Sequence, residues 1–320
     1  MSIVFGPIPS RRLGRSLGVN NIPPKVCSYS CIYCQVGITD SMCINRKEYY
    51  KPDEIFKVVS EKVNQLIKAG EKIDYTTFVP DGEPTLDINL GESIELVKSL
   101  GIKTAVITNA SLLWRPDVKD ELKLADWVSV KVDSAYQDIW HKINRPHGKL
   151  NFEKILQGIE TFAREYEGTL VTETMLVRRV NDTLESLNKT AKYIQKINPQ
   201  KSYILVPTRP PAEKNVEIPR ENSLNIAYQI FSSYLNNAEF LFSGEGVDFT
   251  YLGEVESELL SIVSVHPMTK EAVEDFINKA DSNWQVIENL IKENKLKEVT
   301  YSGRMYYIKS FEKDHQQVNS

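Results

Sequence analysis

The sequence predicts an α/β protein built around a mostly parallel sheet. From about residue 50 onward, stretches with helical apolar spacing alternate with short runs rich in β-branched residues, which is the order that βα units produce. Roughly six or seven such units fit the chain before residue 254. They indicate a barrel, open or closed, with a flavodoxin-like open sheet as the alternative. In both architectures the reactive groups lie at the carboxyl ends of the strands.

The first helix is expected at residues 52–69, because Pro52-Asp53 can open it, Gly70 can close it, and its apolar residues share one face. A strand near residues 17–20 precedes it. Further strands, each a short apolar or β-branched run, are expected at residues 75–79, 104–108, 127–132, 170–177, 203–206 and 239–242. Helices near residues 91–100, 117–124, 135–143, 151–166, 184–197 and 221–236 separate them.

The pattern changes after Glu254. Thr269 can cap a helix that runs to Ala280, Ser282 can cap a second one over residues 283–293, and residues 296–308 are typical of a hairpin. We therefore expect a core of residues 1–253, a small winged-helix-like domain of residues 254–311, and a disordered tail of residues 312–320. Residues 256–311 carry seven Lys and Arg against nine Asp and Glu, so a docking or substrate-gating role is favoured over DNA binding.

The composition is that of an ordinary globular protein, with 41% hydrophobic and 26% charged residues among 320. A net charge of −4 argues against a general polyanion binder. No basic start followed by an apolar stretch and no run of eighteen apolar residues occurs, so we expect a cytoplasmic protein without membrane association. Four cysteines, three of them within eight residues, suit a metal cofactor in a reducing compartment better than disulfides.

Those three cysteines, Cys27, Cys31 and Cys34, have the spacing C-x3-C-x2-C. Three thiolates on a [4Fe–4S] cluster would leave one iron open to another ligand. A structural zinc site or inert thiols are the alternatives, and a closed zinc site needs a fourth ligand. Cys43 is the only other cysteine. It is either a partly buried free thiol, an auxiliary cluster ligand or a residue that handles a radical.

The cysteine loop, with Tyr33 before the third cysteine, resembles the signature loop of the radical S-adenosylmethionine (SAM) superfamily. The resemblance implies a partial (β/α)6 TIM-like barrel, a [4Fe–4S] cluster on the three cysteines, and SAM on the open iron. It also implies that a flavodoxin- or ferredoxin-type donor supplies one electron. SAM is then split to a 5′-deoxyadenosyl radical, which takes a hydrogen atom from the substrate.

Two further segments resemble SAM-binding parts of that superfamily. Asp81-Gly82-Glu83-Pro84 follows an expected strand and is similar to the Gly-Gly-Glu-Pro segment that holds the SAM amino group. Asp81 stands where the first glycine often lies, which matters if the amino group must approach closely. Asn109 and Ser111 follow the next strand, where the family contacts SAM. A solvated turn and an ordinary helix cap are the alternatives.

A row of polar residues is expected on the inner face of the sheet. Valines alternate with Ser129, Lys131 and Asp133 in one strand, and an inward lysine needs a partner or an anionic ligand. The SAM carboxylate or an acidic substrate would serve, as would a structural pair with Glu173 or Asp133. Lys131 and Glu173 are both expected to bind SAM or substrate and are the catalytic candidates.

Arginines are dense before the cysteine loop, at Arg11, Arg12 and Arg15, and arginine suits phosphate or carboxylate. Residues 5–35 resemble a radical SAM subgroup that is grouped with the tRNA wyosine-base synthases. This implies RNA modification, with a peptide or protein substrate, or a non-catalytic metal-stabilised binding module, as alternatives. Arg145 and Arg209 lie in later loops and are further substrate candidates. All five arginines could instead tie loops to acidic partners.

Overall fold

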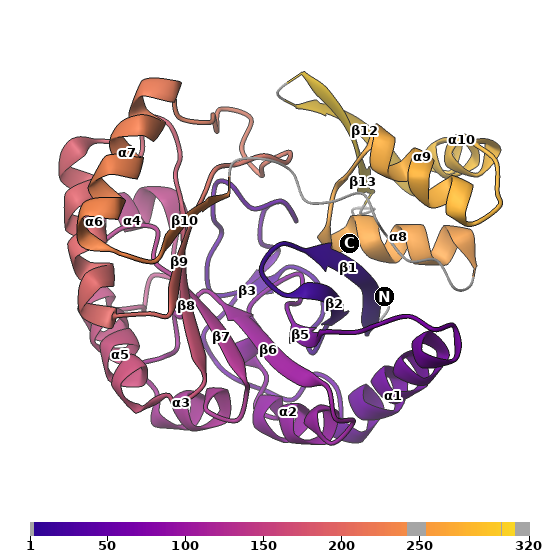
Figure 1. Cartoon of the computed structure of the whole chain (residues 1–320), viewed down its shortest axis with the longest axis horizontal. Helices are drawn as coiled ribbons and strands as arrows, with labels where there is room; N and C mark the ends of the chain where they lie inside the picture. Colours follow the sequence, from indigo (N-terminus) through magenta and orange to yellow (C-terminus); the bar gives the residue numbers. More distant parts are fainter. Residues whose placement is uncertain (1–2, 242–253, 302, 311–320) are drawn as a thin grey trace, which may run out of the picture.

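A computed structural model describes residues 3–241, 254–301 and 303–310 of the chain. Its main feature is one eight-stranded, curved sheet with helices on its outer side (Figure 1). The strands are β1 (Val4–Ser10), β2 (Gly14–Val19), β5 (Tyr75–Phe78), β6 (Lys103–Thr108), β7 (Trp127–Lys131), β8 (Thr169–Met175), β9 (Lys201–Leu205) and β10 (Ala238–Leu241). The helices are α1 (Pro52–Lys68), α2 (Leu90–Lys98), α3 (Pro116–Leu122), α4 (Gln137–Asn144), α5 (Phe152–Glu165), α6 (Leu184–Ile197) and α7 (Glu221–Tyr234). The expected α/β class is confirmed.

The strands follow one another in the order β1-β2-β5-β6-β7-β8-β9-β10. All neighbours from β2 to β10 are parallel, whereas β1 is antiparallel to β2. A flavodoxin-like sheet reverses its strand order at a switch point, and this one does not, so that alternative is wrong. The antiparallel strand β1 was not predicted, since its glycine and two prolines obscured the β pattern.

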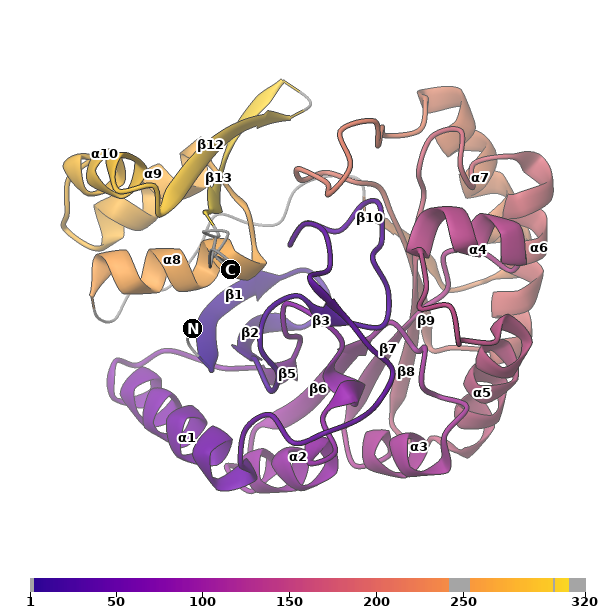
Figure 2. The ribbon, with the colours of Figure 1, turned by 180° about the vertical axis from the view of Figure 1, so that it is seen from behind.

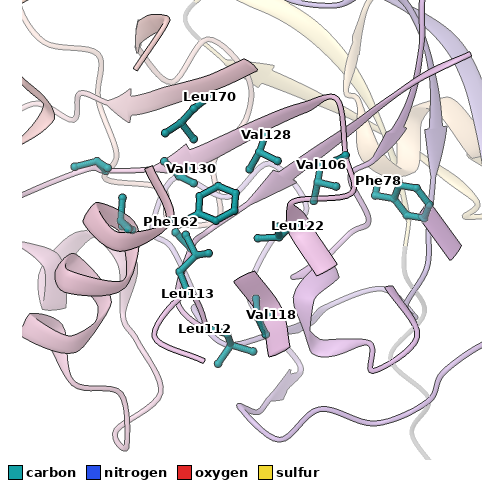
Figure 3. Close-up of a cluster of buried hydrophobic side chains, with 14 of the residues drawn as sticks. Phe78, Val106, Leu112, Leu113, Val118, Leu122, Val128, Val130, Phe162 and Leu170 are labelled. Carbon is teal, nitrogen blue, oxygen red and sulfur yellow. The ribbon is translucent and has the colours of Figure 1, made fainter. Parts of the chain in front are cut away.

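The main hydrophobic core lies between the sheet and the outer helices. Figure 3 shows part of this core, where apolar side chains of neighbouring strands pack against those of the helices and loops that cover the sheet. Val128 and Val130 of β7 are fully buried there, so the alternation predicted for this strand is confirmed. Each such side chain stabilises the fold by about 1.5–3 kcal/mol. Ser129 and Lys131 are left for the inner face.

A smaller apolar cluster closes one end of the inner face. Leu13, in the turn between β1 and β2, packs there with Trp127, Val171 and Tyr203. The turn between β1 and β2 therefore enters the interior of the curved sheet. This places Arg12, the neighbour of Leu13, beside the inward polar groups of β7 and β8.

The last described residues form a separate module beside β1 (Figure 2). Its elements are α8 (Val255–Val265), β11 (Met268–Thr269), α9 (Lys270–Lys279), α10 (Gln285–Lys292), β12 (Leu296–Tyr301) and β13 (Arg304–Lys309), with strand order β11-β13-β12. The two later helices and the hairpin were expected, and α8 and β11 were not. Phe5 and Ile8 of β1 belong to the core of this module.

Of the two helix caps predicted in the C-terminal module, one is present and the other is not. Thr269 accepts a hydrogen bond from the backbone of Ala272, as expected of the cap of α9. Ser282 does not cap α10, because α10 begins only at Gln285, and the side chain of Asn283 accepts from the Gln285 backbone instead. The expected tail, the end of the last core strand at Phe242 and residue 302 of the expected hairpin lie outside the described residues. None of the helices in the described ranges combines the length and the apolarity needed to cross a bilayer.

Candidate functional site

The cysteine loop begins at β3 (Val26–Cys27), which pairs with β4 (Ser41–Met42). Residues after β6 hold one side of this loop. The Asn109 amide donates to the Ser28 hydroxyl at 2.9 Å and to the Cys27 sulfur at 3.5 Å. The Ser111 hydroxyl lies 2.6 Å from that of Ser28. Asn109 and Ser111 were expected to contact SAM, and the structure places them against the cysteine loop.

The last residue of α4 holds the other side. The Asn144 amide donates to the Cys31 sulfur at 3.4 Å and to the Asp133 carboxylate at 2.7 Å. Asp133 in turn accepts from the Tyr33 hydroxyl and, at 2.8 Å, from the backbone of Met175. The loop is therefore fixed between the carboxyl ends of the strands and α4.

The three thiols are half-buried, and burial raises the pKa of all three, that of Cys31 to about 12. They therefore hold their protons unless a cation displaces them, as iron does on binding. Amide N–H groups aimed at two of the sulfurs are the surroundings that iron–sulfur clusters use. The residues thus fit the cluster that the spacing predicts.

A single metal ion fits them less well. Within the described ranges, no three His, Cys, Asp or Glu side chains converge tightly enough to hold one ion. A cubane cluster does not require such convergence, because each thiolate binds a different iron. Cys43 lies next to this site, since its backbone N–H donates to the carbonyl of Cys27 at 3.0 Å. Its sulfur is 3.9 Å from the Tyr49 hydroxyl, and its role stays a prediction.

The segment after β5 packs directly on the start of the cysteine loop. The Lys25 N–H donates to the Asp81 carbonyl at 2.6 Å, and the Glu83 N–H donates to the Val26 carbonyl at 3.1 Å. A Cβ at Gly82 would lie 2.0 Å from the Val26 carbonyl oxygen, closer than real Cβ atoms ever approach. Glycine is therefore needed at position 82 for the approach of two backbone segments.

Glu83 is buried, with 1% of its surface exposed, and precedes the short helix η1 (Pro84–Leu86). Its carboxylate accepts hydrogen bonds from the Thr85 hydroxyl and the Thr108 hydroxyl, both at 2.6 Å, and from the Asn109 backbone at 2.7 Å. Burial raises its pKa, and these donors oppose the rise. Glu83 therefore joins the ends of β5 and β6, with its acceptor capacity largely used inside the protein.

Asp81 differs from Glu83 because the described residues give its carboxylate no hydrogen-bond donor. It is 3% exposed, and neither of its carboxylate oxygens receives a hydrogen bond within the described part of the chain. Burial raises its pKa to about 7, although the charges of Lys309 and Lys25 act in the opposite direction. A buried carboxylate without a partner is costly, so this one is unlike an ordinary turn residue.

Glu173 of β8 is the centre of an inward charge cluster. It pairs with Arg12, lies 3.3 Å from the Lys131 ammonium, and accepts from the Ser129 hydroxyl at 2.9 Å. Burial alone would raise its pKa, but Arg12 and Lys131 lower it to about 2. The Lys131 ammonium also sits 5.3 Å from the centre of the Tyr33 ring. The structural Lys131–Glu173 pair is thus present, directly beside the cysteine loop.

A cavity of about 260 Å³ joins these groups. Its lining includes Cys34 and Tyr33 from the cysteine loop, Lys131 and Glu173 from the sheet, and three of the predicted arginines, Arg11, Arg12 and Arg209. The structure brings the cysteine loop together with most of the lysine and arginine side chains that were predicted to bind SAM or substrate. Burial lowers the pKa of Lys131, but Glu173 and Asp133 outweigh it, so Lys131 keeps its charge there.

Two predicted arginines lie elsewhere. Arg15 pairs with Glu71, and its backbone N–H donates to Asp74 just before β5, at the amino end of the parallel strands. Arg145, which follows α4 as its C-cap in a left-handed conformation, pairs with Glu213 at 2.5 Å. Neither lines the cavity, and both fit the alternative role of tying loops together.

Arg209 connects the C-terminal module to the cysteine loop. Its guanidinium donates to the Gln35 side chain at 2.7 Å and lies 3.0 Å from the His266 ring at the end of α8. The hydroxyls of Tyr301 and Tyr306 donate to the carbonyls of Pro207 and Thr208, the two residues before Arg209. The module therefore helps to position one wall of the cavity.

Two positioning residues have roles that the sequence did not predict. The sequence places Asn144 in a loop that could reach substrate, whereas the structure places it at the end of α4, where it donates to Cys31 and Asp133. Arg46, whose side chain is 4% exposed, donates to the carbonyls of Thr85 and Asp87 and so holds η1 in place. No local pattern marks it, because its partners lie about forty residues away along the chain.

Residues 21–194, just over half of the chain, match the family model of the radical SAM superfamily. The chain belongs to the radical SAM superfamily. It is accordingly an enzyme of the radical SAM type, and the family implies SAM and an iron–sulfur cluster as cofactors. A UPF0026 protein of Methanocaldococcus jannaschii is 44% identical over the whole of both chains.

More distant radical SAM proteins share the fold or part of the sequence. An S-adenosylmethionine-dependent nucleotide dehydratase of Flammeovirga pacifica is 24% identical and aligns with 72% of this chain and 79% of its own. A radical SAM methyltransferase structure from Sphaerobacter thermophilus covers 71% of this chain and 67% of that one, with 14% identity and a TM-score of 0.54. A structure of the wyosine synthase TYW1 covers 92% and 80%, with 15% identity and a TM-score of 0.48.

Proposed function

We propose that this enzyme binds a [4Fe–4S] cluster through Cys27, Cys31 and Cys34 and cleaves SAM in the adjoining cavity of about 260 Å³. The observation that carries the proposal is that this cavity is lined by Cys34 and Tyr33 together with Lys131 and Glu173. When bound, the reduced cluster and SAM supply a 5′-deoxyadenosyl radical that abstracts hydrogen from the substrate. A flavodoxin- or ferredoxin-type electron donor and a cytoplasmic location belong to the same proposal.

The protein's own residues orient and shield this chemistry. Asn109 and Asn144 donate hydrogen bonds to cysteine sulfurs and fix the loop that holds them. Lys131 and Arg12 supply positive charge at the cavity wall, which suits the carboxylate of SAM or an anionic substrate. Glu173 holds both side-chain cations in place, and Glu83 joins the ends of β5 and β6.

The finer architecture is part of the proposal. Seven parallel strands with an apolar cluster closing one end support a partial (β/α)6-like barrel. The C-terminal order of helix, strand, two helices and a two-stranded hairpin supports a winged-helix-type domain. Because Arg209 and two tyrosines connect this domain to the cavity wall, we assign it a gating or docking role.

The proposed substrate is RNA or a nucleotide. The arginines at the cavity suit phosphate, since guanidinium groups bind phosphate through paired hydrogen bonds. A relative of this chain is named a nucleotide dehydratase, which supports the same substrate class. Modification of tRNA is the specific form that the sequence resemblance implies.

SAM cleavage after anaerobic cluster reconstitution tests the proposed function. With a strong reductant, the wild-type protein should release 5′-deoxyadenosine and methionine from SAM. Cys31→Ala should lose both the cluster absorbance and this product. Cys43→Ala is the matched control, a cysteine near the same loop that should keep both. A fully loaded, reduced protein that releases no 5′-deoxyadenosine would overturn the proposal.

A further inference from the structure

A second cavity of about 120 Å³ adjoins the larger one. The two share Arg12, Gln35 and Arg209 in their linings. The smaller cavity also reaches Phe5 and Ile8 of β1, Asp81 after β5, and His266 at the end of α8. It therefore lies between the edge of the sheet, the segment before Glu83 and the C-terminal module.

Asp81 lines this cavity, and the described residues supply its carboxylate with no hydrogen-bond donor, although the charges of Lys25 and Lys309 act on it. Its carboxylate is more than nine-tenths buried, and neither oxygen accepts a hydrogen bond within the described residues. A buried acceptor without donors is costly, and a ligand that supplies the missing donors removes that cost. Two free oxygens on one carboxylate can receive two N–H groups side by side. The site therefore calls for a ligand with an amino group or paired N–H groups.

The remaining walls fit a flat ring. The Phe5 ring lies against the backbone of Gly18, where an added Cβ would come within 2.1 Å of it. Val79 and Ile107 add further apolar surface. A volume of about 120 Å³ is close to that of a cavity of roughly 150 Å³ that binds benzene, so it has room for about one ring. Arg12 and Arg209 line both this cavity and the larger one, so they lie where the two cavities meet.

Much of this cavity comes from parts of the chain outside the family match at residues 21–194. Phe5, Ile8 and Arg12 precede that segment, and Arg209 and His266 follow it. Elements that the superfamily shares serve the chemistry that it shares. Elements particular to this chain therefore point to its own substrate.

We propose that the smaller cavity receives the base of a nucleotide whose amino group donates to Asp81, while its phosphate lies against Arg12 and Arg209. The proposal rests on the proposed function only in placing the radical chemistry in the neighbouring cavity. The nucleotide is either free or part of an RNA strand, and the two sources share this chemistry. The base-binding role is separate from SAM binding and can be measured without catalysis.

Two pairs of mononucleotides test it by titration calorimetry on the cluster-loaded protein with SAM present. GMP differs from IMP by one exocyclic amino group, and CMP carries an amino group where UMP carries an oxygen. We expect the amino-bearing member of at least one pair to bind about tenfold more tightly, the scale of one base-edge recognition. Equal affinities within both pairs would overturn the proposal, whatever the outcome of SAM cleavage.

Asp81→Asn then locates the effect. The variant keeps the shape of the side chain and should bring the affinity ratio close to one, with iron content and SAM affinity unchanged. A variant that loses SAM affinity but keeps the nucleotide preference would show that Asp81 serves SAM instead. The comparison within wild-type protein stands even where the variant fails to hold its cluster. Repeating the pairs within a single-stranded RNA pentamer distinguishes the two sources, because an RNA substrate should bind more tightly as the pentamer.

Discussion

Replacement of Gly82 by alanine should push the segment after β5 away from the start of the cysteine loop. The added Cβ would lie 2.0 Å from the Val26 carbonyl oxygen, and real contacts start at 3.0 Å, so the two backbones must separate by about 1 Å. That movement stretches the hydrogen bond from the Glu83 N–H to the same carbonyl, now 3.1 Å long. Overpacking of this kind costs about 1–3 kcal/mol. Misplacement of catalytic groups by about 1 Å can lower a rate on the order of 100-fold.

Gly148→Ala is the matched control, because nothing lies within 4 Å of a Cβ at that position. Both variants and the wild type would be reconstituted anaerobically and compared for iron per chain, thermal stability and the rate of 5′-deoxyadenosine release. We expect the Gly82 variant to lose stability and nearly all of its rate, and the control to match the wild type. Equal rates and stabilities for both alanine variants would refute the role assigned to this close backbone contact.

Two other substitutions probe the charge cluster and the loop anchor. Glu173→Gln leaves Arg12 and Lys131 without their shared carboxylate and should destabilise the fold by about 3 kcal/mol at neutral pH. Because the pKa of Glu173 is depressed, from 4.5 to about 2, its stabilisation is present above the ordinary value and fades as the pH falls through about 2. Denaturant melts of both proteins against pH should therefore converge only in strong acid, and convergence near pH 5 would contradict the pairing. Asn144→Leu removes the amide donor at the Cys31 sulfur and should lower iron retention and cost about 1–3 kcal/mol. Unchanged iron per chain in that variant would argue against an anchoring role.

The parts of the site that the sequence predicted are those encoded locally. The cysteine spacing is complete within eight residues, so it could be recognised without the fold. The role of Glu83 could not, because the sequence does not reveal that Thr85, Thr108 and Asn109 meet around its carboxylate. The pair of Arg12 and Glu173 joins residues 161 positions apart and depends on the β1–β2 turn entering the sheet.

Asp81 was singled out in the sequence, but its surroundings could not be predicted from it. Its departure from the glycine of the family was visible in the sequence. The burial of its carboxylate without a hydrogen-bond donor among the described residues was not, because the cavity that Asp81 lines is formed with residues of β1 and with His266 of the C-terminal module, far away in the sequence. The strand alternation that put Lys131 inward was predicted correctly, since it needs only a two-residue period.

The shared packing of β1 with the C-terminal module has a consequence for biosynthesis. Phe5 and Ile8 complete a core whose other members begin at α8, about 250 residues later. At ribosomal speeds of about 5–20 residues per second, these side chains wait on the order of 10–50 s for their partners. During that interval the edge of the nascent sheet exposes apolar side chains and an unpaired surface, the kind that chaperones bind. The cavity of about 120 Å³ between β1 and the C-terminal module can therefore form only after the residues of that module have left the ribosome.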